Sequence, residues 1–158
     1  MTTPDPSVPT LYEWAGGQPA FERLTARFYD RVPLDPVLAL VFGDIGAEHV
    51  TRVAHFIAEV FGGPPLYTQE RGGHPTMVRE HFNRQLSEGQ RRHFFDLLCD
   101  CADEVGLATD PEFRSAFVAY LEWGTRLAVL NSQPGASESI DAAMPRWGWG
   151  VPGAPYQG

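Results

Sequence analysis

The sequence predicts an all-α fold. Apolar residues recur at helical intervals in several segments of the 158-residue chain, and glycine or proline breaks separate these segments. No segment shows a strand pattern of comparable strength. Helices this short bury their apolar stripes by packing crosswise, and two antiparallel pairs are an economical arrangement.

The first amphipathic helix follows the Gly16-Gly17 break and ends near Pro33. Its inward stripe consists of Phe21, Leu24, Phe28 and Val32, with Tyr29 beside it. A short connector from Pro36, helical or irregular, carries Phe42. A further helix runs from about 47 to 61, and its single face holds His49, Val53, Phe56, Ile57 and Val60.

A loop from Gly62 to Gly73 contains Tyr67, and the next helix begins near Pro75. Helix is the expected state around His81, so Met77, Val78 and His81 share one inward face. A longer helix begins at Ser87, with Gln90 as its capping partner, and ends near Gly106. The last helix begins at Asp110-Pro111-Glu112.

Residues 1–10 are expected to form a flexible N-terminal segment, and residues 133–158 an irregular tail rich in glycine and proline. Trp147 and Trp149 either attach this tail to the helices by apolar burial or leave it mobile. The folded domain is therefore expected over residues 11–132.

The net charge of −8 argues against a nucleic-acid or anionic-membrane surface, which would need a cationic patch. All 12 basic side chains are arginine, so lysine chemistry is excluded. Cys99 and Cys101 point to different faces of a helix and are not expected to form a disulfide. Without a membrane-length apolar stretch or signal peptide pattern, a cytoplasmic location is expected.

Three inward stripes carry a polar group: Tyr29, His49 and His81. Each such group needs a partner when buried. One histidine directed at a core is more often a hydrogen-bonded core residue than a metal ligand, but two histidines and a tyrosine that converge favour a metal cofactor.

Blocks of the sequence resemble a known family. These blocks are FYDRV at residues 28–32, FGGPPLYTQERGGHP at residues 61–75 and YLEWGTRLAVLNS at residues 120–132. Together with Gly16-Gly17, Phe42 and His81, and in this order and separation, they are similar to truncated haemoglobins of the second group. The resemblance spans nearly the whole core, from about residue 11 to residue 132.

The resemblance implies a two-over-two helical sandwich that encloses haem b, with His81 as the proximal iron ligand. It implies that Tyr29 donates a hydrogen bond to a bound diatomic ligand, that His49 and Val53 face this ligand, and that Phe42 packs on the haem. It also implies that Met77 contacts the haem. His49 has two alternatives: a solvent-facing position at the start of the helix, or ligation of the iron itself.

One position departs from the family. Phe94 stands thirteen residues beyond His81, where the second group usually has a tryptophan whose indole donates to the ligand. Phe94 supplies only apolar bulk. A shift of one residue would place His93 or Phe95 there, and only His93 would restore a donor. Ligand affinity therefore cannot be carried over from the family.

Arg79 and Tyr67 are the candidates for contacts to the haem propionates, with His74 as a weaker third. Family members often have arginine directly before the proximal histidine, where this chain has Glu80. Arg79 has the alternative of a solvated helix position, and Arg52 is expected at the surface.

The implied function is binding of oxygen, carbon monoxide and nitric oxide at haem iron, as in oxygen transport. Nitric oxide oxidation or peroxide reduction would use the same pocket with an unidentified reductase, so enzymatic activity stays open. A homodimer is also left open, and neither nucleic acid nor membrane is an expected partner. The alternatives are a non-haem metalloenzyme with His49, His74 and His81 as ligands, and a globin-fold sensing or binding module without haem.

Overall fold

Helices make up the regular secondary structure of the chain, which we describe from a computed structural model covering residues 3, 5–136 and 143–157. These residues contain no strand, and the all-α prediction is confirmed. The helices are α1 (Leu11–Ala15), α2 (Gln18–Arg31), a 3-10 turn η1 (Val32–Leu34), α3 (Pro36–Phe42), α4 (Ala47–Val60), α5 (Leu66–Arg71), α6 (His74–Glu80), α7 (Glu88–Glu104) and α8 (Pro111–Asn131).

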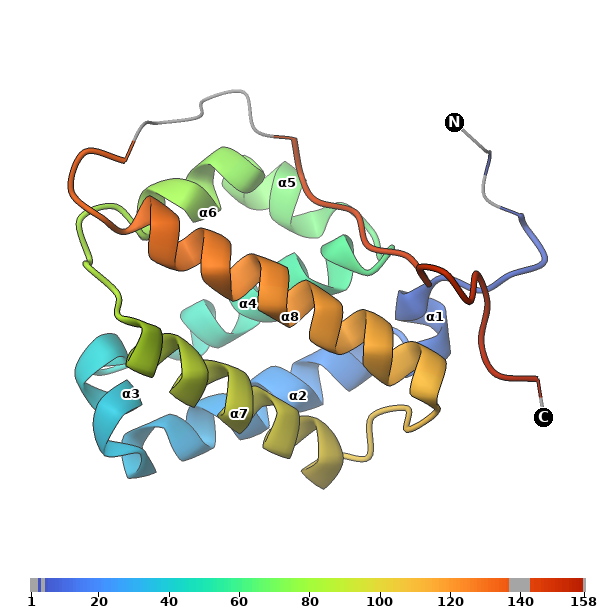
Figure 1. Cartoon of the computed structure of the whole chain (residues 1–158), viewed down its shortest axis with the longest axis horizontal. Helices are drawn as coiled ribbons and strands as arrows, with labels where there is room; N and C mark the ends of the chain where they lie inside the picture. Colours follow the sequence, from blue (N-terminus) through green and yellow to red (C-terminus); the bar gives the residue numbers. More distant parts are fainter. Residues whose placement is uncertain (1–2, 4, 137–142, 158) are drawn as a thin grey trace.

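Two helix pairs form the layers of the fold. Helix α2 packs on α4, and α7 packs on α8 (Figure 1). Helix α2 also contacts α7, which joins the layers, while α3 and η1 close one end against α7 and α2. The short α5 packs on α4, and α6 follows α5 along the chain (Figure 1).

The long helices begin at the residues that the sequence predicts. The Ser87 hydroxyl accepts the Gln90 N–H at 3.1 Å, and the Gln90 side chain accepts the Ser87 N–H at 2.9 Å, which is a complete capping box for α7. The Asp110 carboxylate accepts the Phe113 N–H at 3.0 Å and caps α8. Both capping residues lie within three positions of the groups they satisfy.

Two short helices and one helix end differ from the prediction. The expected loop around Tyr67 contains α5, whose first turn is held from α4: the buried Glu59 carboxylate accepts the Thr68 N–H at 2.9 Å. Helix α1 was not predicted either. The prediction of helix around His81 was wrong by one position, because α6 ends at Glu80 and His81 is its capping residue.

Aromatic rings fill the core between the pairs. Phe61 is fully buried at the end of α4, and its ring lies 5.7 Å from Phe21, 6.0 Å from Phe117 and 5.4 Å from Tyr120. These rings come from α2 and α8, so the residue that caps the end of α4 contacts both layers. Burial of aromatic area on this scale stabilises the layered arrangement.

The described part of the C-terminal tail is attached to the helices, which is one of the two outcomes expected for it. Trp149 is buried, and its indole N–H donates to the Pro9 carbonyl at 2.8 Å. The Trp147 N–H donates to the Val60 carbonyl at 2.8 Å. Residues 1, 2, 4, 137–142 and 158 of the expected terminal segments lie outside the described residues.

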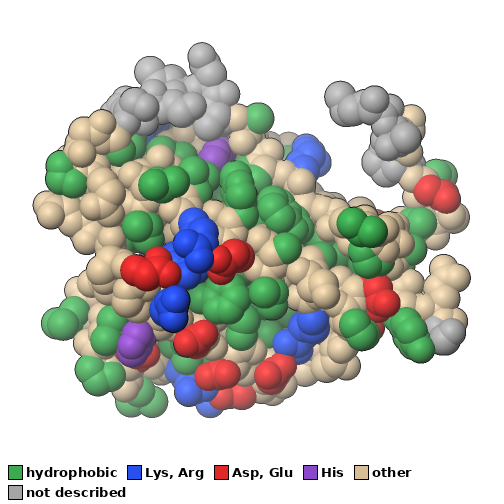
Figure 2. All heavy atoms as spheres, viewed as in Figure 1, with side chains coloured by type: hydrophobic (Ala, Val, Ile, Leu, Met, Phe, Trp, Pro, Cys, Tyr) green, Lys and Arg blue, Asp and Glu red, His purple; other side chains and the backbone are tan. Residues whose placement is uncertain are grey.

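Charged side chains gather where α7 and α8 meet the surface (Figure 2). Arg91 is buried there and pairs with Glu88 at 2.6 Å and Glu122 at 3.3 Å. Arg126 pairs with Glu122 one helical turn away, which extends this network along α8. Among the helices described, none is long and apolar enough to cross a membrane.

Candidate functional site

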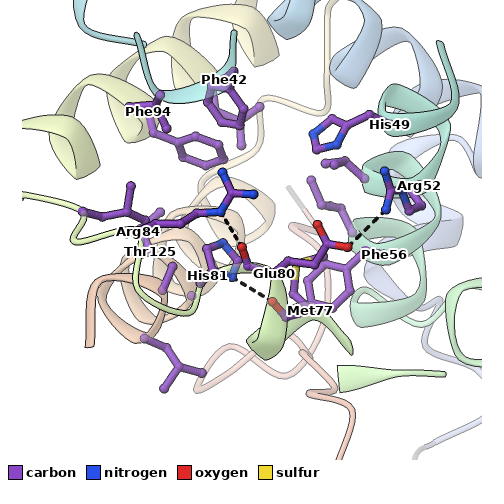
Figure 3. A pocket seen from close by; sticks show the side chains of 18 of the residues that line it. Phe42, His49, Arg52, Phe56, Met77, Glu80, His81, Arg84, Phe94 and Thr125 are labelled. Atoms are coloured by element: carbon purple, nitrogen blue, oxygen red, sulfur yellow. Dashed lines mark hydrogen bonds and ion pairs between the residues drawn. The ribbon is translucent and has the colours of Figure 1, made fainter. Parts of the chain in front are cut away.

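A cavity of about 590 Å³ lies between α4 and α6 and extends toward α7 and α8 (Figure 3). Sites for cofactors and other small molecules commonly occupy about 300–1,000 Å³. Its walls are more apolar than polar. Of the residues predicted for the site, those that line the cavity are Tyr29, Phe42, His49, Val53, Tyr67, His74, Met77, His81 and Phe94.

His81 lies on the α6 side of the cavity. Its Nδ1 donates to the Met77 carbonyl at 2.8 Å, which assigns the proton to Nδ1 and leaves Nε2 as the basic ring nitrogen. Burial is the main cause that lowers the pKa of His81, and the Met77 hydrogen bond partly opposes this shift. A neutral imidazole with a fixed tautomer is the state in which histidine binds a metal.

Tyr29 and His49 lie together on α2 and α4. The His49 Nε2 is 3.0 Å from the Tyr29 hydroxyl, and the two rings meet edge to face at 5.2 Å. Burial raises the pKa of Tyr29 well above its usual value, so the hydroxyl keeps its proton. Burial, followed by the charge of Arg52, lowers the pKa of His49 and favours the neutral ring. Because the His49 ring lines the cavity and contacts the buried Tyr29, the solvent-facing alternative was wrong.

Phe94 lines the cavity, whereas the neighbouring His93 points outward. The Phe94 ring lies 4.9 Å from Phe28 and 6.3 Å from Phe42. His93 is exposed, and its Nδ1 lies 3.0 Å from the Asp35 carboxylate. Helix α7 thus presents a hydrocarbon ring to the cavity, and the one-residue shift that would have brought in a histidine donor does not occur.

Charged residues stand at the mouth of the cavity. Arg52 lines it and pairs with Glu80 at 3.2 Å; its side chain stays partly exposed, so a surface position and a place at the cavity are both met. Arg84, from the segment after His81, also lines the cavity, and its Nε donates to the Glu80 carbonyl (Figure 3). Arg79 is exposed and is not among the lining residues.

Tyr67 and His74 also line the cavity, and both are less exposed than the charged residues at its mouth. Both are buried, and the His74 ring stacks on Phe56 at 6.5 Å. Burial is the main cause that raises the pKa of Tyr67 to about 12. The His74 Nδ1 is buried without a hydrogen-bond partner in the described part of the chain. A bound group that offers an acceptor or donor would satisfy this nitrogen.

Several lining residues were not identified from the sequence as site residues. They include Arg84 and, from α8, Tyr120, Leu121 and Thr125. The α8 residues recur at helical spacing, which predicts a buried face but does not distinguish a cavity wall from solid core. Arg84 follows His81 by three residues, and its orientation depends on backbone angles that the sequence does not reveal.

His49, His74 and His81 all line the cavity but do not converge on one point that a metal ion could occupy. No group of three or more histidine, cysteine or carboxylate side chains within residues 3, 5–136 and 143–157 is placed to hold one. The three-histidine metal site considered as an alternative is therefore not formed.

Known proteins share this fold and sequence pattern. The chain is 30% identical over 117 residues to the group 2 truncated haemoglobin YjbI of Bacillus subtilis, covering 74% of this chain and 86% of that protein. The group II truncated haemoglobin from Bacillus anthracis superimposes with a TM-score of 0.70 at 26% identity, over 77% of this chain and 91% of the other. A truncated oxygen-avid haemoglobin from Bacillus subtilis superimposes with a TM-score of 0.69 at 30% identity, over 77% of this chain and 99% of the other.

These similarities confirm the predicted resemblance to truncated haemoglobins of the second group and the two-over-two fold. The sequence profile described as "Bacterial-like globin" matches residues 10–123, which include α1 through α7 and the first part of α8. The chain belongs to the bacterial-like globin family.

Proposed function

We propose that this chain binds haem b between α4 and α6 and uses it to bind oxygen and related diatomic ligands. The observation that carries the proposal is His81: a cavity-lining imidazole whose Nδ1 donates to the Met77 carbonyl at 2.8 Å, leaving Nε2 free to bind a metal. The cavity of about 590 Å³ and its apolar walls suit a flat macrocycle with a hydrocarbon periphery. The arginines at its mouth suit carboxylate substituents.

Haem iron, when bound, supplies reversible coordination of a diatomic ligand. His81 would hold the iron through Nε2, and the Met77 carbonyl fixes the orientation of its ring. Phe42 and Phe94 pack along the cavity wall and exclude water from it. Their rings provide no donor, so polar stabilisation of a ligand falls to Tyr29 and His49.

Tyr29 and His49 act as one donor unit in this proposal. With both groups neutral, their 3.0 Å hydrogen bond uses a single proton. When His49 carries its proton on Nε2, it donates to the Tyr29 oxygen and leaves the Tyr29 proton for a ligand. A ligand that carries partial negative charge is stabilised by this hydroxyl, and His49 orients it.

The test is the visible spectrum of the purified protein supplied with haem, recorded as ferric, ferrous and ferrous with carbon monoxide. A strong porphyrin band that shifts with carbon monoxide is expected for the wild type. His81→Gly should change the ferrous spectrum, and added imidazole should restore it. His93→Ala, at the exposed histidine that pairs with Asp35, is the control and should leave the spectrum unchanged.

The absence of any porphyrin band in the wild-type protein would refute the proposal. Metal analysis of the same sample then separates the alternatives, because metal without porphyrin indicates a non-haem site and neither indicates a cofactor-free module. A band that is identical in wild type and His81→Gly would retain haem binding but remove His81 as the ligand.

A further inference from the structure

The segment between α6 and α7 contains unusual backbone angles on both sides of Arg84. Asn83 has a φ of 58° and Gln85 a φ of 50°, and both lie in the left-handed region that glycine normally occupies. These are the non-glycine residues with positive φ among those the structure describes. Such conformations cost free energy and persist only where the surroundings hold them in place.

The end of α8 supplies that support. The Gln85 N–H donates to the Ser132 carbonyl at 2.9 Å, and the Leu86 N–H donates to the Ser132 hydroxyl at 3.0 Å. The Gln133 side-chain amide donates to the Leu86 carbonyl at 3.0 Å. Ser132 is fully buried, and its hydrogen bond to Leu86 is partly buried. The segment is therefore a fixed connection that directs Arg84, rather than a free loop.

Arg84 is directed at the cavity. Its side chain lines the cavity, and its Nε donates to the Glu80 carbonyl, which leaves the other guanidinium nitrogens directed toward the lining side chains of the cavity (Figure 3).

The pairing of charges at the mouth distinguishes Arg84 from its neighbours. Of the other arginines that line the cavity, Arg52 has Glu80 as a partner at 3.2 Å and Arg91 has Glu88 at 2.6 Å. Arg84 forms no ion pair with any residue in the described ranges, although it is held beside an apolar cavity. An arginine fixed in this way presents a planar set of donors that matches a carboxylate.

We propose that Arg84 binds a propionate carboxylate of the haem, and that the strained Asn83–Gln85 segment exists to position its guanidinium. This inference rests on the haem-binding function proposed above and assigns the carboxylate contact to Arg84 instead of Arg79. The exposed Arg79 does not line the cavity, whereas Arg84 does.

The experiment measures loss of ferric haem from the holoprotein to an excess of apomyoglobin, followed by the change in the porphyrin band. Arg84→Gln should accelerate haem loss by about fivefold, the effect of removing one solvent-accessible charge-assisted contact. Arg79→Gln should have a smaller effect. Arg23→Gln, on the exposed side of α2 and away from the cavity, is the matched control and should leave the rate unchanged.

A second cofactor shows whether the effect of Arg84→Gln comes from the lost ion pair with a carboxylate or from altered folding. With iron protoporphyrin dimethyl ester, which lacks free carboxylates, wild type and Arg84→Gln should lose the cofactor at equal rates. This comparison also works on the wild type alone, which should release the ester faster than haem. Equal rates for wild type and Arg84→Gln with haem would overturn the inference, and so would an Arg84→Gln effect that persists with the ester. A wild-type protein that takes up no haem would instead refute the proposed function itself.

Discussion

Replacement of Tyr29 by phenylalanine removes the hydroxyl that lies 3.0 Å from the His49 Nε2 and changes little else in the cavity. A hydrogen bond to a charged group contributes about 1.5–3 kcal/mol. Tyr29 is buried, with 8% of its surface exposed, and bound oxygen carries only a partial charge. We therefore expect the loss of binding free energy to lie near the lower value. At about 1.4 kcal/mol for each factor of ten, oxygen should dissociate about tenfold faster from Tyr29→Phe.

His49→Leu tests whether the two residues form one unit. If His49 acts by orienting the Tyr29 hydroxyl, its loss should accelerate dissociation by about threefold. The double variant should then dissociate oxygen at about the rate of Tyr29→Phe, because the group that His49 orients is already missing. Independent donors would instead give the product of the two single effects.

The assay is stopped-flow displacement of oxygen by carbon monoxide from the ferrous protein. Tyr156→Phe, at an exposed tyrosine of the tail, is the matched control and should leave the rate unchanged. An unchanged rate in Tyr29→Phe would remove Tyr29 from ligand stabilisation, and multiplicative effects in the double variant would refute the coupled unit.

Further predictions concern stability. Phe61→Ala, at a fully buried ring, should lower the free energy of unfolding by about 3–5 kcal/mol in urea titrations, and a loss below about 1 kcal/mol would contradict the assigned core. Trp149→Phe keeps an aromatic ring but loses the indole hydrogen bond, so it should cost about 1 kcal/mol in the same titration; no loss would contradict that bond's contribution. Burial lowers the pKa of His49, His74 and His81, so the unfolded chain binds protons at a higher pH than the native apoprotein does, and stability should fall as the pH is lowered below about 6.5. Thermal unfolding of the apoprotein checks this, and a midpoint independent of pH would contradict it.

Local signals made most of the fold predictable. Ser87 with Gln90, and Asp110 with Pro111, mark the starts of α7 and α8, because each cap satisfies backbone groups only a few residues away. Helix α5 escaped prediction because its support is distant in the chain, in the carboxylate of Glu59 on α4.

The residues of the site also fall into a group that the sequence predicts and a group that it does not. Tyr29, His49 and His81 each belong to an apolar stripe, so helical periodicity alone directs them inward, and the structure lines one cavity with all three. Arg84 could not be found by this route. It stands outside any helix, and its direction depends on left-handed backbone angles and on contacts with Ser132, which lies 48 positions further along the chain.

The attachment of the tail has a spectroscopic consequence. The four tryptophans of the chain form two ring pairs, each with one member in the tail: Trp14 with Trp149 at 6.1 Å, and Trp123 with Trp147 at 5.7 Å. Aromatic rings in fixed, asymmetric surroundings give near-ultraviolet circular dichroism, which is lost when specific packing is lost. Release of the tail would therefore change the near-ultraviolet spectrum while the far-ultraviolet signal of the helices persisted, so docking of the tail is measurable in the unmodified protein.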